Sequence, residues 1–146
     1  MKGLVSVVVA TLDEAESIRG CVASLLMQDV TSHDLEVLVV DGGSSDGTRD
    51  IVRGMARDDQ RIRLLENPRR RAPSGFNIGL AAARGEFVFI AGAHTEFDSG
   101  YVRTCIEELK TREAHGCSGR VWTVPASPSL ESVLVCWAMS HPFGVS

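Results

Sequence analysis

One carboxylate stands where a predicted buried strand meets a pair of glycines. The apolar run Leu38–Val40 ends at Asp41, and Gly42-Gly43 follows directly. Continuous apolar residues are typical of a parallel strand that helices cover on both faces. The carboxyl end of such a strand lies at the edge of the sheet where α/β proteins bind ligands, and the glycines let a ligand approach the backbone. Asp41 is therefore the first candidate for a ligand contact.

Other polar side chains follow the ends of further predicted strands. Thr11 and Glu14 come after the apolar run Leu4–Ala10, and His94 follows a later apolar run. The basic run Arg69–Arg71 lies between two prolines, which predicts a loop. Guanidinium groups bind phosphate oxygens in bidentate pairs, although a solvated loop is the ordinary explanation of such a run. Glu14 has its own alternative, since a carboxylate in the first turn of a helix interacts favourably with the helix dipole.

The elements that must position these residues alternate between strand and helix. The predicted strands are Leu4–Ala10, Leu35–Val40, Arg61–Glu66, Glu86–Ala91 and Gly116–Val124. The predicted helices are Glu14–Gln28, Thr48–Arg57, Ser74–Ala83, Ser99–Thr111 and Leu130–Ser140. This alternation is typical of an α/β fold with a doubly wound parallel sheet. Right-handed crossovers then place the loops after the first, second and fourth strands along one edge.

The composition excludes several classes of protein. The chain has 146 residues, about one domain, with a formal net charge of −4 that argues against general nucleic-acid binding. Its four cysteines lie in apolar stretches without C-x-x-C spacing, which predicts buried, reduced thiols and no zinc site. No apolar segment approaches the roughly 18 residues of a membrane span. No G-x-G-x-x-G motif follows the first strand, so a Rossmann dinucleotide site is excluded.

Three stretches resemble the nucleotide-sugar domain of family 2 glycosyltransferases: VSVVVATLDEAESIRGCVASLL, VLVVDGGSSDGTRDIV and GFNIGLAAARGEFVFIAGAHTEF. The loop NPRRRAPSGFN and the late segment AMSHPFGVS resemble the branch that builds bacterial exopolysaccharides of the succinoglycan type. The resemblance implies the GT-A fold, a Rossmann-like three-layer α/β/α domain with a mainly parallel sheet. The chain ends without a closing element, so we expect residues 1–146 to be the nucleotide-sugar-binding domain, with the C-terminal acceptor part missing.

The resemblance also implies a UDP-sugar donor and a set of residues around its nucleotide. Asp41 matches the aspartate that accepts the uracil N3–H, and the end of the first strand matches positions that hold uracil and ribose. Asn77 matches the asparagine of an A-R-N-x-G pattern, although a polar residue on an exposed helix face explains it equally. The residues implied to bind the nucleotide are Ala10, Thr11, Leu12, Glu14, Asp41, Arg71 and Asn77.

The metal loop departs from the family pattern. Similar enzymes carry Asp-x-Asp or Asp-Ala-His there, to place a divalent metal, Mn²⁺ or Mg²⁺, against the diphosphate. This chain has Gly92-Ala93-His94, so His94 is the one residue that matches a metal ligand. A lone imidazole suits Mn²⁺ better than Mg²⁺. Glu96 or Asp98 are candidates for the missing oxygen donor, and the alternative is that His94 is an ordinary loop histidine.

The implied reaction is attack by an acceptor hydroxyl on the anomeric carbon of a UDP-sugar, with inversion, in exopolysaccharide or other cell-surface polysaccharide synthesis. The acceptor is a saccharide or a lipid-linked saccharide. The family places its carboxylate base beyond the metal loop, and no residue after His94 matches that motif. The catalytic residues thus stay unassigned, and we expect this chain alone to be inactive.

Similar full-length enzymes act in the cytoplasm, at the inner face of the membrane, with which a missing C-terminal region would associate. The departure at Gly92 favours an alternative, a non-catalytic UDP-binding module.

Overall fold

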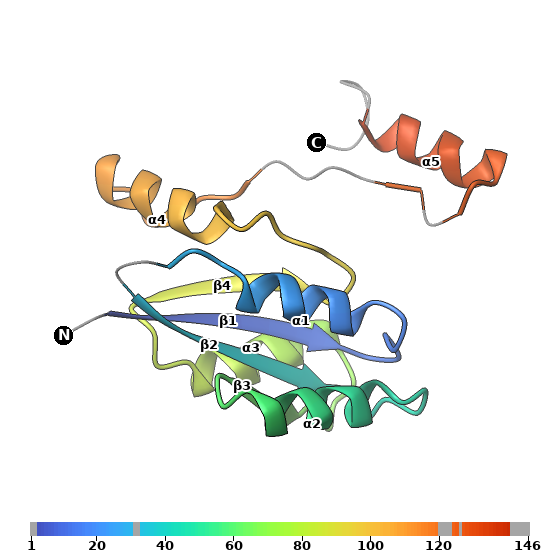
Figure 1. Cartoon of the computed structure of the whole chain (residues 1–146), viewed down its shortest axis with the longest axis horizontal. Helices are drawn as coiled ribbons and strands as arrows, with labels where there is room; N and C mark the ends of the chain where they lie inside the picture. Colours follow the sequence, from blue (N-terminus) through green and yellow to red (C-terminus); the bar gives the residue numbers. More distant parts are fainter. Residues whose placement is uncertain (1–2, 31–32, 120–123, 126, 141–146) are drawn as a thin grey trace. The chain divides into compact units, whose positions relative to one another are not determined.

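A computed structural model describes residues 3–30, 33–119, 124–125 and 127–140 (Figure 1). The chain divides into two units, Met1–His115 and Gly116–Ser146. The elements of the first unit are β1 (Gly3–Thr11), α1 (Ile18–Leu26), β2 (His33–Asp41), α2 (Thr48–Asp58), β3 (Ile62–Glu66), α3 (Ala72–Ala82), β4 (Phe87–Gly92) and α4 (Tyr101–Thr111). The second unit contains α5 (Leu130–Ser140). Among the described residues, no helix combines the length and the apolar character needed to cross a membrane.

Within the described part of the first unit, four strands form one parallel sheet in the order β3-β2-β1-β4. The register aligns the carboxyl ends of the strands. Thr11 lies opposite Asp41, and Ala10 lies opposite Gly92. The predicted ligand edge is therefore formed by the end of β1, with β2 on one side and β4 on the other.

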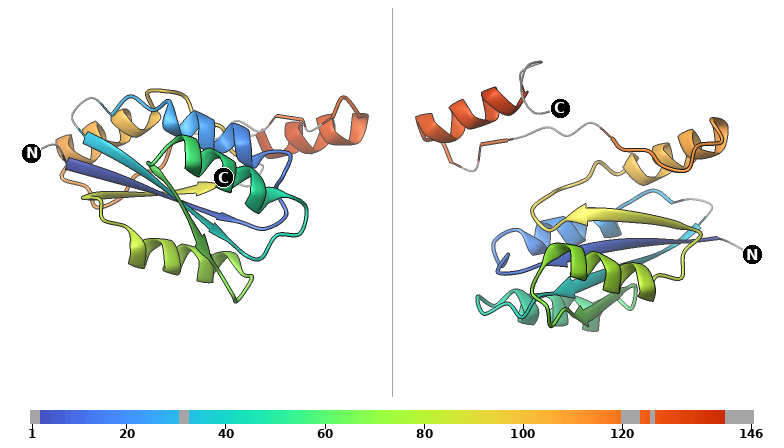
Figure 2. Two further views of the ribbon diagram at one scale, coloured as in Figure 1. Left: turned by 60° about the horizontal axis from the view of Figure 1, so that its bottom comes forward. Right: turned by 180° about the vertical axis from the view of Figure 1, so that it is seen from behind.

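Helices cover both faces of this sheet, which confirms the predicted α/β fold with a parallel sheet between helix layers (Figures 1 and 2). Helices α1, α2 and α4 pack on one face, where Val5, Val7 and Val9 of β1 point. Helix α3 packs on the other face against Val8, Leu38 and Val40. The alternation of β1 residues between two buried cores explains why Val7, Val8 and Val9 are consecutive apolar residues.

The boundaries differ from the predictions at several points. Helix α1 begins at Ile18 and not at Glu14, because backbone N–H groups of residues 13–15 donate to side chains of the loop after β2. Helix α3 begins two residues early, at Ala72, since Pro73 fits the first turn of a helix.

The predicted strand Gly116–Val124 is not present in the residues described there. Residues 116–119 and 124 carry no strand, and residues 120–123 lie outside the described residues. Residues 116–118 are exposed, so they lack the burial that a sheet strand needs.

The cysteine prediction is also wrong in part: Cys21 and Cys105 are buried, whereas Cys117 is exposed and Cys136 is half-buried.

Candidate functional site

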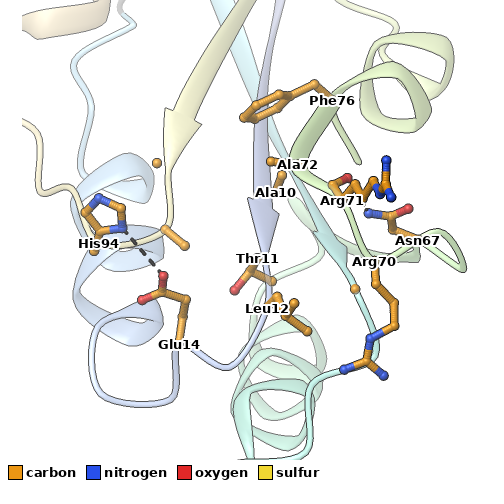
Figure 3. A pocket seen from close by; sticks show the side chains of 13 residues that line it. Ala10, Thr11, Leu12, Glu14, Asn67, Arg70, Arg71, Ala72, Phe76 and His94 are labelled. Carbon is orange, nitrogen blue, oxygen red and sulfur yellow. Dashed lines mark hydrogen bonds and ion pairs between the residues drawn. The ribbon is translucent and has the colours of Figure 1, made fainter. Parts of the chain in front are cut away.

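A cavity of about 330 Å³ opens at the carboxyl ends of β1 and β4 (Figure 3). Its walls come from the end of β1, the loop after β4, and the segment that joins β3 to α3. The lining residues are Ala10, Thr11, Leu12, Glu14, Gly42, Asn67, Arg70, Arg71, Ala72, Phe76, Gly92, Ala93 and His94. Six residues predicted from the sequence are thus brought together here, namely Ala10, Thr11, Leu12, Glu14, Arg71 and His94.

Thr11 presents an unpaired hydroxyl in this wall. The residue is 6% exposed, and its Oγ1 has no hydrogen-bond partner within the described part of the chain. Its backbone carbonyl accepts a hydrogen bond from the N–H of Gly42, at 2.8 Å, which ties the end of β1 to the loop after β2. Because buried hydroxyls in native proteins are nearly always hydrogen-bonded, this one is a candidate for a ligand contact.

His94 and Glu14 form a pair on one side of the cavity (Figure 3). The imidazole Nδ1 lies 3.5 Å from Glu14 Oε1, an ion pair when the imidazole is protonated. The other oxygen of Glu14, Oε2, accepts a hydrogen bond from Ser17 Oγ at 2.8 Å. Both oxygens of the carboxylate thus have partners on the protein.

The residues around His94 do not fit a divalent metal. Gly92 has no side chain, and a Cβ built there would lie 3.9 Å from His94 Cε1, so a ligand side chain at this position would face the imidazole. The described residues contain no group of three or more histidine, cysteine, aspartate and glutamate side chains that could hold a metal ion. Divalent cations such as Mn²⁺ and Mg²⁺ need several oxygen or nitrogen ligands.

The two acidic residues proposed as replacement donors also lie elsewhere. Glu96 points at α1, since a Cβ on Gly20 would approach its Oε1 to 2.6 Å. Neither Glu96 nor Asp98 lines the cavity. The sequence-based suggestion that one of them supplies the missing oxygen is therefore wrong for this arrangement of the loop.

Asp41 lies at the predicted edge of the sheet, but its carboxylate is directed into its own loop. It accepts hydrogen bonds from the N–H of Gly43, at 2.8 Å, and from the N–H and Oγ of Ser44. Arg49 Nε lies 3.6 Å from Asp41 Oδ2. Asp41 is 1% exposed. Asp41 lines a smaller neighbouring cavity of about 200 Å³, together with Arg49 and Arg70, and not the main cavity.

The loop after β2 also fastens the segment after β1. Asp13, with a φ of 54°, accepts a hydrogen bond from the N–H of Ser45 at 2.7 Å. Asp46 accepts hydrogen bonds from the N–H of Ala15, at 2.8 Å, and from the N–H and Oγ1 of Thr48. The hydrogen bonds from Thr48 and Ala15 lower the pKa of Asp46. Asp46 therefore connects the segment after β1 to the first residue of α2.

Sequence reasoning missed Asn67, which organises the basic loop. Asn67 is 4% exposed; its Nδ2 donates to the carbonyl of Arg71, at 2.9 Å, and its Oδ1 accepts from Ser74 Oγ and from the N–H of Arg69. Asparagine before proline is a frequent turn starter, so the pair Asn67-Pro68 carried a signal for this role.

The three arginines of this loop differ in position. Arg71 lines the main cavity, as predicted, and Arg70 lines both cavities, with its backbone at a φ of 55°. Arg69 is exposed and lines neither. Asn77 is exposed on α3 and lines neither cavity.

The sequence matches the family model described as glycosyl transferase family 2 over residues 6–132. This chain belongs to that family. It is 31% identical over 104 residues to the succinoglycan biosynthesis protein ExoA of Rhizobium meliloti, covering 70% of this chain and 31% of that protein. It is 34% identical over 112 residues to a GalNAc(5)-diNAcBac-PP-undecaprenol beta-1,3-glucosyltransferase of Campylobacter jejuni, covering 75% of this chain and 36% of that protein. The resemblance that the sequence motifs indicated is confirmed.

Solved structures of glycosyltransferases share the fold. The mannosyltransferase PcManGT from Pyrobaculum calidifontis, in complex with GDP-Man and Mn²⁺, is 31% identical, with a TM-score of 0.68 over 75% of this chain and 33% of that one. Staphylococcus aureus TarS is 22% identical, with a TM-score of 0.67 over 84% of this chain and 39% of that one. At this identity the similarity shows the fold alone. These neighbours confirm the GT-A architecture. The chain spans about a third of the length of the curated relatives it matches.

Proposed function

We propose that this chain is the nucleotide-sugar-binding part of an inverting glycosyltransferase that uses a UDP-sugar. The cavity at the carboxyl ends of β1 and β4, lined by Thr11 and two arginines, carries the proposal. Membership of family 2 and a relative in complex with a nucleotide sugar support it. The acceptor is a saccharide or a lipid-linked saccharide, since relatives are named for succinoglycan biosynthesis and for transfer to an undecaprenol-linked saccharide.

In the proposed reaction, an acceptor hydroxyl oxygen forms a bond to the anomeric carbon of the donor. The bond between that carbon and the phosphate oxygen breaks, UDP leaves with its electron pair, and the hydroxyl proton passes to a carboxylate base. The cavity residues would hold the nucleotide and stabilise the charge that develops on the leaving diphosphate. No residue of this chain is assigned as the base. The proposed location is the cytoplasm at the inner face of the membrane, which lipid-linked acceptors would require.

A non-catalytic UDP-binding module is the second candidate function, and the poor fit of the loop after β4 to a metal favours it. The two candidates differ in what happens to the sugar. Transfer from a UDP-sugar, assayed with a chain extended to the length of its relatives, would support the enzyme. Binding of UDP without any transfer by the extended chain would support the module.

Substitution of Thr11 by valine tests the proposed binding site. Valine keeps the shape and removes the hydroxyl, so we expect affinity for UDP to fall by about three- to ten-fold, the cost of one lost hydrogen bond. The free protein should be as stable as before or slightly more stable, because no internal hydrogen bond is lost. Calorimetry with UDP and thermal melting without it measure the two effects. Thr104→Val on the exposed face of α4 is the matched control, and equal UDP affinity of both variants and the parent chain would reject this site.

A further inference from the structure

The cavity wall contains more positive than negative side chains. Arg70 and Arg71 lie on one side of Thr11, and His94 lies on the other (Figure 3). Among the described residues that line the cavity, Glu14 is the one carboxylate, and both of its oxygens have protein partners. A ligand in this cavity would therefore meet two arginines on one side, an imidazole on the other and little opposing negative charge.

The same wall lacks what a bridging metal would need. Gly92 contributes no side-chain donor atom, and Glu96 is turned toward α1. A cation between the diphosphate and the protein would have His94 and the already paired Glu14 as its protein ligands. Hard cations that bridge phosphates are held in proteins by carboxylate oxygens, which this loop does not offer.

We propose that Arg70 and Arg71 neutralise the diphosphate of the bound nucleotide and that His94 contacts it, so that nucleotide binding by this chain needs no divalent cation. The inference rests on the proposed function. Two features prepare the arginines for this task. Asn67 fixes the loop through the carbonyl of Arg71, at 2.9 Å, and the loop holds the backbone of Arg70 in the left-handed region. The N-terminus of α3 begins at Ala72 in the same wall, which adds the positive end of a helix dipole.

His94 completes the set from the opposite side. Its imidazole is 74% exposed and is placed by the carboxylate of Glu14, 3.5 Å from Nδ1. An imidazole N–H can donate to a phosphate oxygen. Thr11, whose buried hydroxyl is unpaired in the described structure, lies between the arginines and His94 and is a candidate for a further contact that needs no metal.

Calorimetry with UDP and with uridine, each in EDTA and in millimolar Mn²⁺, tests the proposal on the whole chain. We expect the dissociation constant of UDP to change less than about two-fold between the two buffers. In EDTA, UDP should bind at least about ten-fold more tightly than uridine, the effect of charge-assisted hydrogen bonds to the diphosphate. Arg71→Ala and His94→Asn should each weaken UDP binding about five- to ten-fold in EDTA without changing uridine binding.

Arg69→Ala is the matched control, because it removes the same charge from the same loop at a side chain outside both cavities. Thermal melts establish that each variant is folded. Tightening of UDP binding by ten-fold or more in Mn²⁺, with uridine binding unchanged, would overturn this inference and leave the proposed function standing. Equal losses in Arg71→Ala and Arg69→Ala would overturn it as well. Failure of both UDP and uridine to bind in either buffer would overturn the proposed function and this inference together.

Discussion

Asp41 is the residue in which local structure and proposed function compete most directly. Its carboxylate accepts hydrogen bonds from the backbone of Gly43 and Ser44, and it lies 3.6 Å from Arg49 Nε. To bind a uracil N3–H, as the family resemblance implies, one oxygen must exchange a loop donor for the base. The side chain therefore shapes the loop in the free protein and is a candidate ligand contact in the bound one.

We expect Asp41→Asn to destabilise the free protein by about 1–3 kcal/mol, since an amide nitrogen would face donor groups of the loop and the charge would be lost. Urea denaturation without nucleotide measures this change. Asp34→Asn, at an exposed position of the same strand, should leave the midpoint unchanged. An unaltered midpoint for Asp41→Asn would show that the loop does not depend on the carboxylate.

Single residues also show where sequence reasoning is sufficient and where it stops. Thr11 and His94 are predicted to lie together because the strands before them end at one edge of a parallel sheet, and Arg71 is predicted to join them because a diphosphate needs guanidinium charge. The structure brings all three to one cavity. The lack of a partner for Thr11 Oγ1 depends on three-dimensional contacts and leaves no trace in the sequence. The role of Asn67 likewise depends on how its loop folds back on itself.

At the scale of elements, a buried carboxylate joins β1, β2 and the segment after α3. Glu36 is 3% exposed and accepts hydrogen bonds from Ser6 Oγ and from the backbone and guanidinium of Arg84. Arg63 Nη1 lies 3.2 Å from its Oε2. Burial raises the pKa of Glu36, but the hydrogen bonds from Arg84, Ser6 and Arg63 outweigh burial and lower it to about 2.

This shift predicts a pH dependence of stability. Because the pKa in the folded state lies below the usual value of 4.5, the contribution of Glu36 is complete above that pH and is lost as the pH falls toward 2. It amounts to up to about 3 kcal/mol. Urea denaturation between pH 7 and pH 2.5 should show Glu36→Gln less stable at pH 7 and less sensitive to acid than the parent chain. Glu86→Gln, at an exposed residue, should follow the parent curve, and parallel acid curves for Glu36→Gln and the parent would contradict the assignment.

Two glycines in helices should respond oppositely to alanine. A Cβ on Gly79 would lie 2.1 Å from Val8 Cγ1, so α3 packs on β1 at a distance that only glycine permits. We expect Gly79→Ala to cost about 1–3 kcal/mol through overpacking. Gly54, inside α2, has no atom within 4 Å of a built Cβ, so Gly54→Ala should stabilise by about 0.5–1 kcal/mol. Thermal melts of both variants measure this, and a stabilising Gly79→Ala would show that α3 does not approach β1 closely.

The order and type of the elements of the first unit were predictable, because buried strands and amphipathic helices differ in period. Their ends were not. Helix α1 loses its first turn to hydrogen bonds with a loop about thirty residues away, and no local pattern encodes such a contact. The prediction of a strand at Gly116–Val124 is wrong for the described residues, because apolar content alone does not supply a neighbouring strand to pair with.

At the scale of the whole molecule, the cavity is built from one of the two units. Every residue that lines the cavity lies between Ala10 and His94, within the first unit. The relatives are about three times as long as the region they share with this chain. We therefore expect binding of a nucleotide and transfer of its sugar to be separable in this protein.

We predict that residues 1–146 bind UDP but transfer no sugar from a UDP-sugar to an added saccharide. An acceptor hydroxyl is a poor nucleophile until a base removes its proton, and a missing general base slows such reactions by about 10²–10⁴-fold. Among the described residues of the cavity wall, the single carboxylate, Glu14, is engaged by His94 and Ser17. Release of UDP from a UDP-sugar, followed with and without acceptor, measures the activity, and calorimetry on the same preparation establishes binding. Acceptor-dependent release of UDP by this chain would show that its own residues provide the base, and Glu14→Gln would then be the first variant to assay.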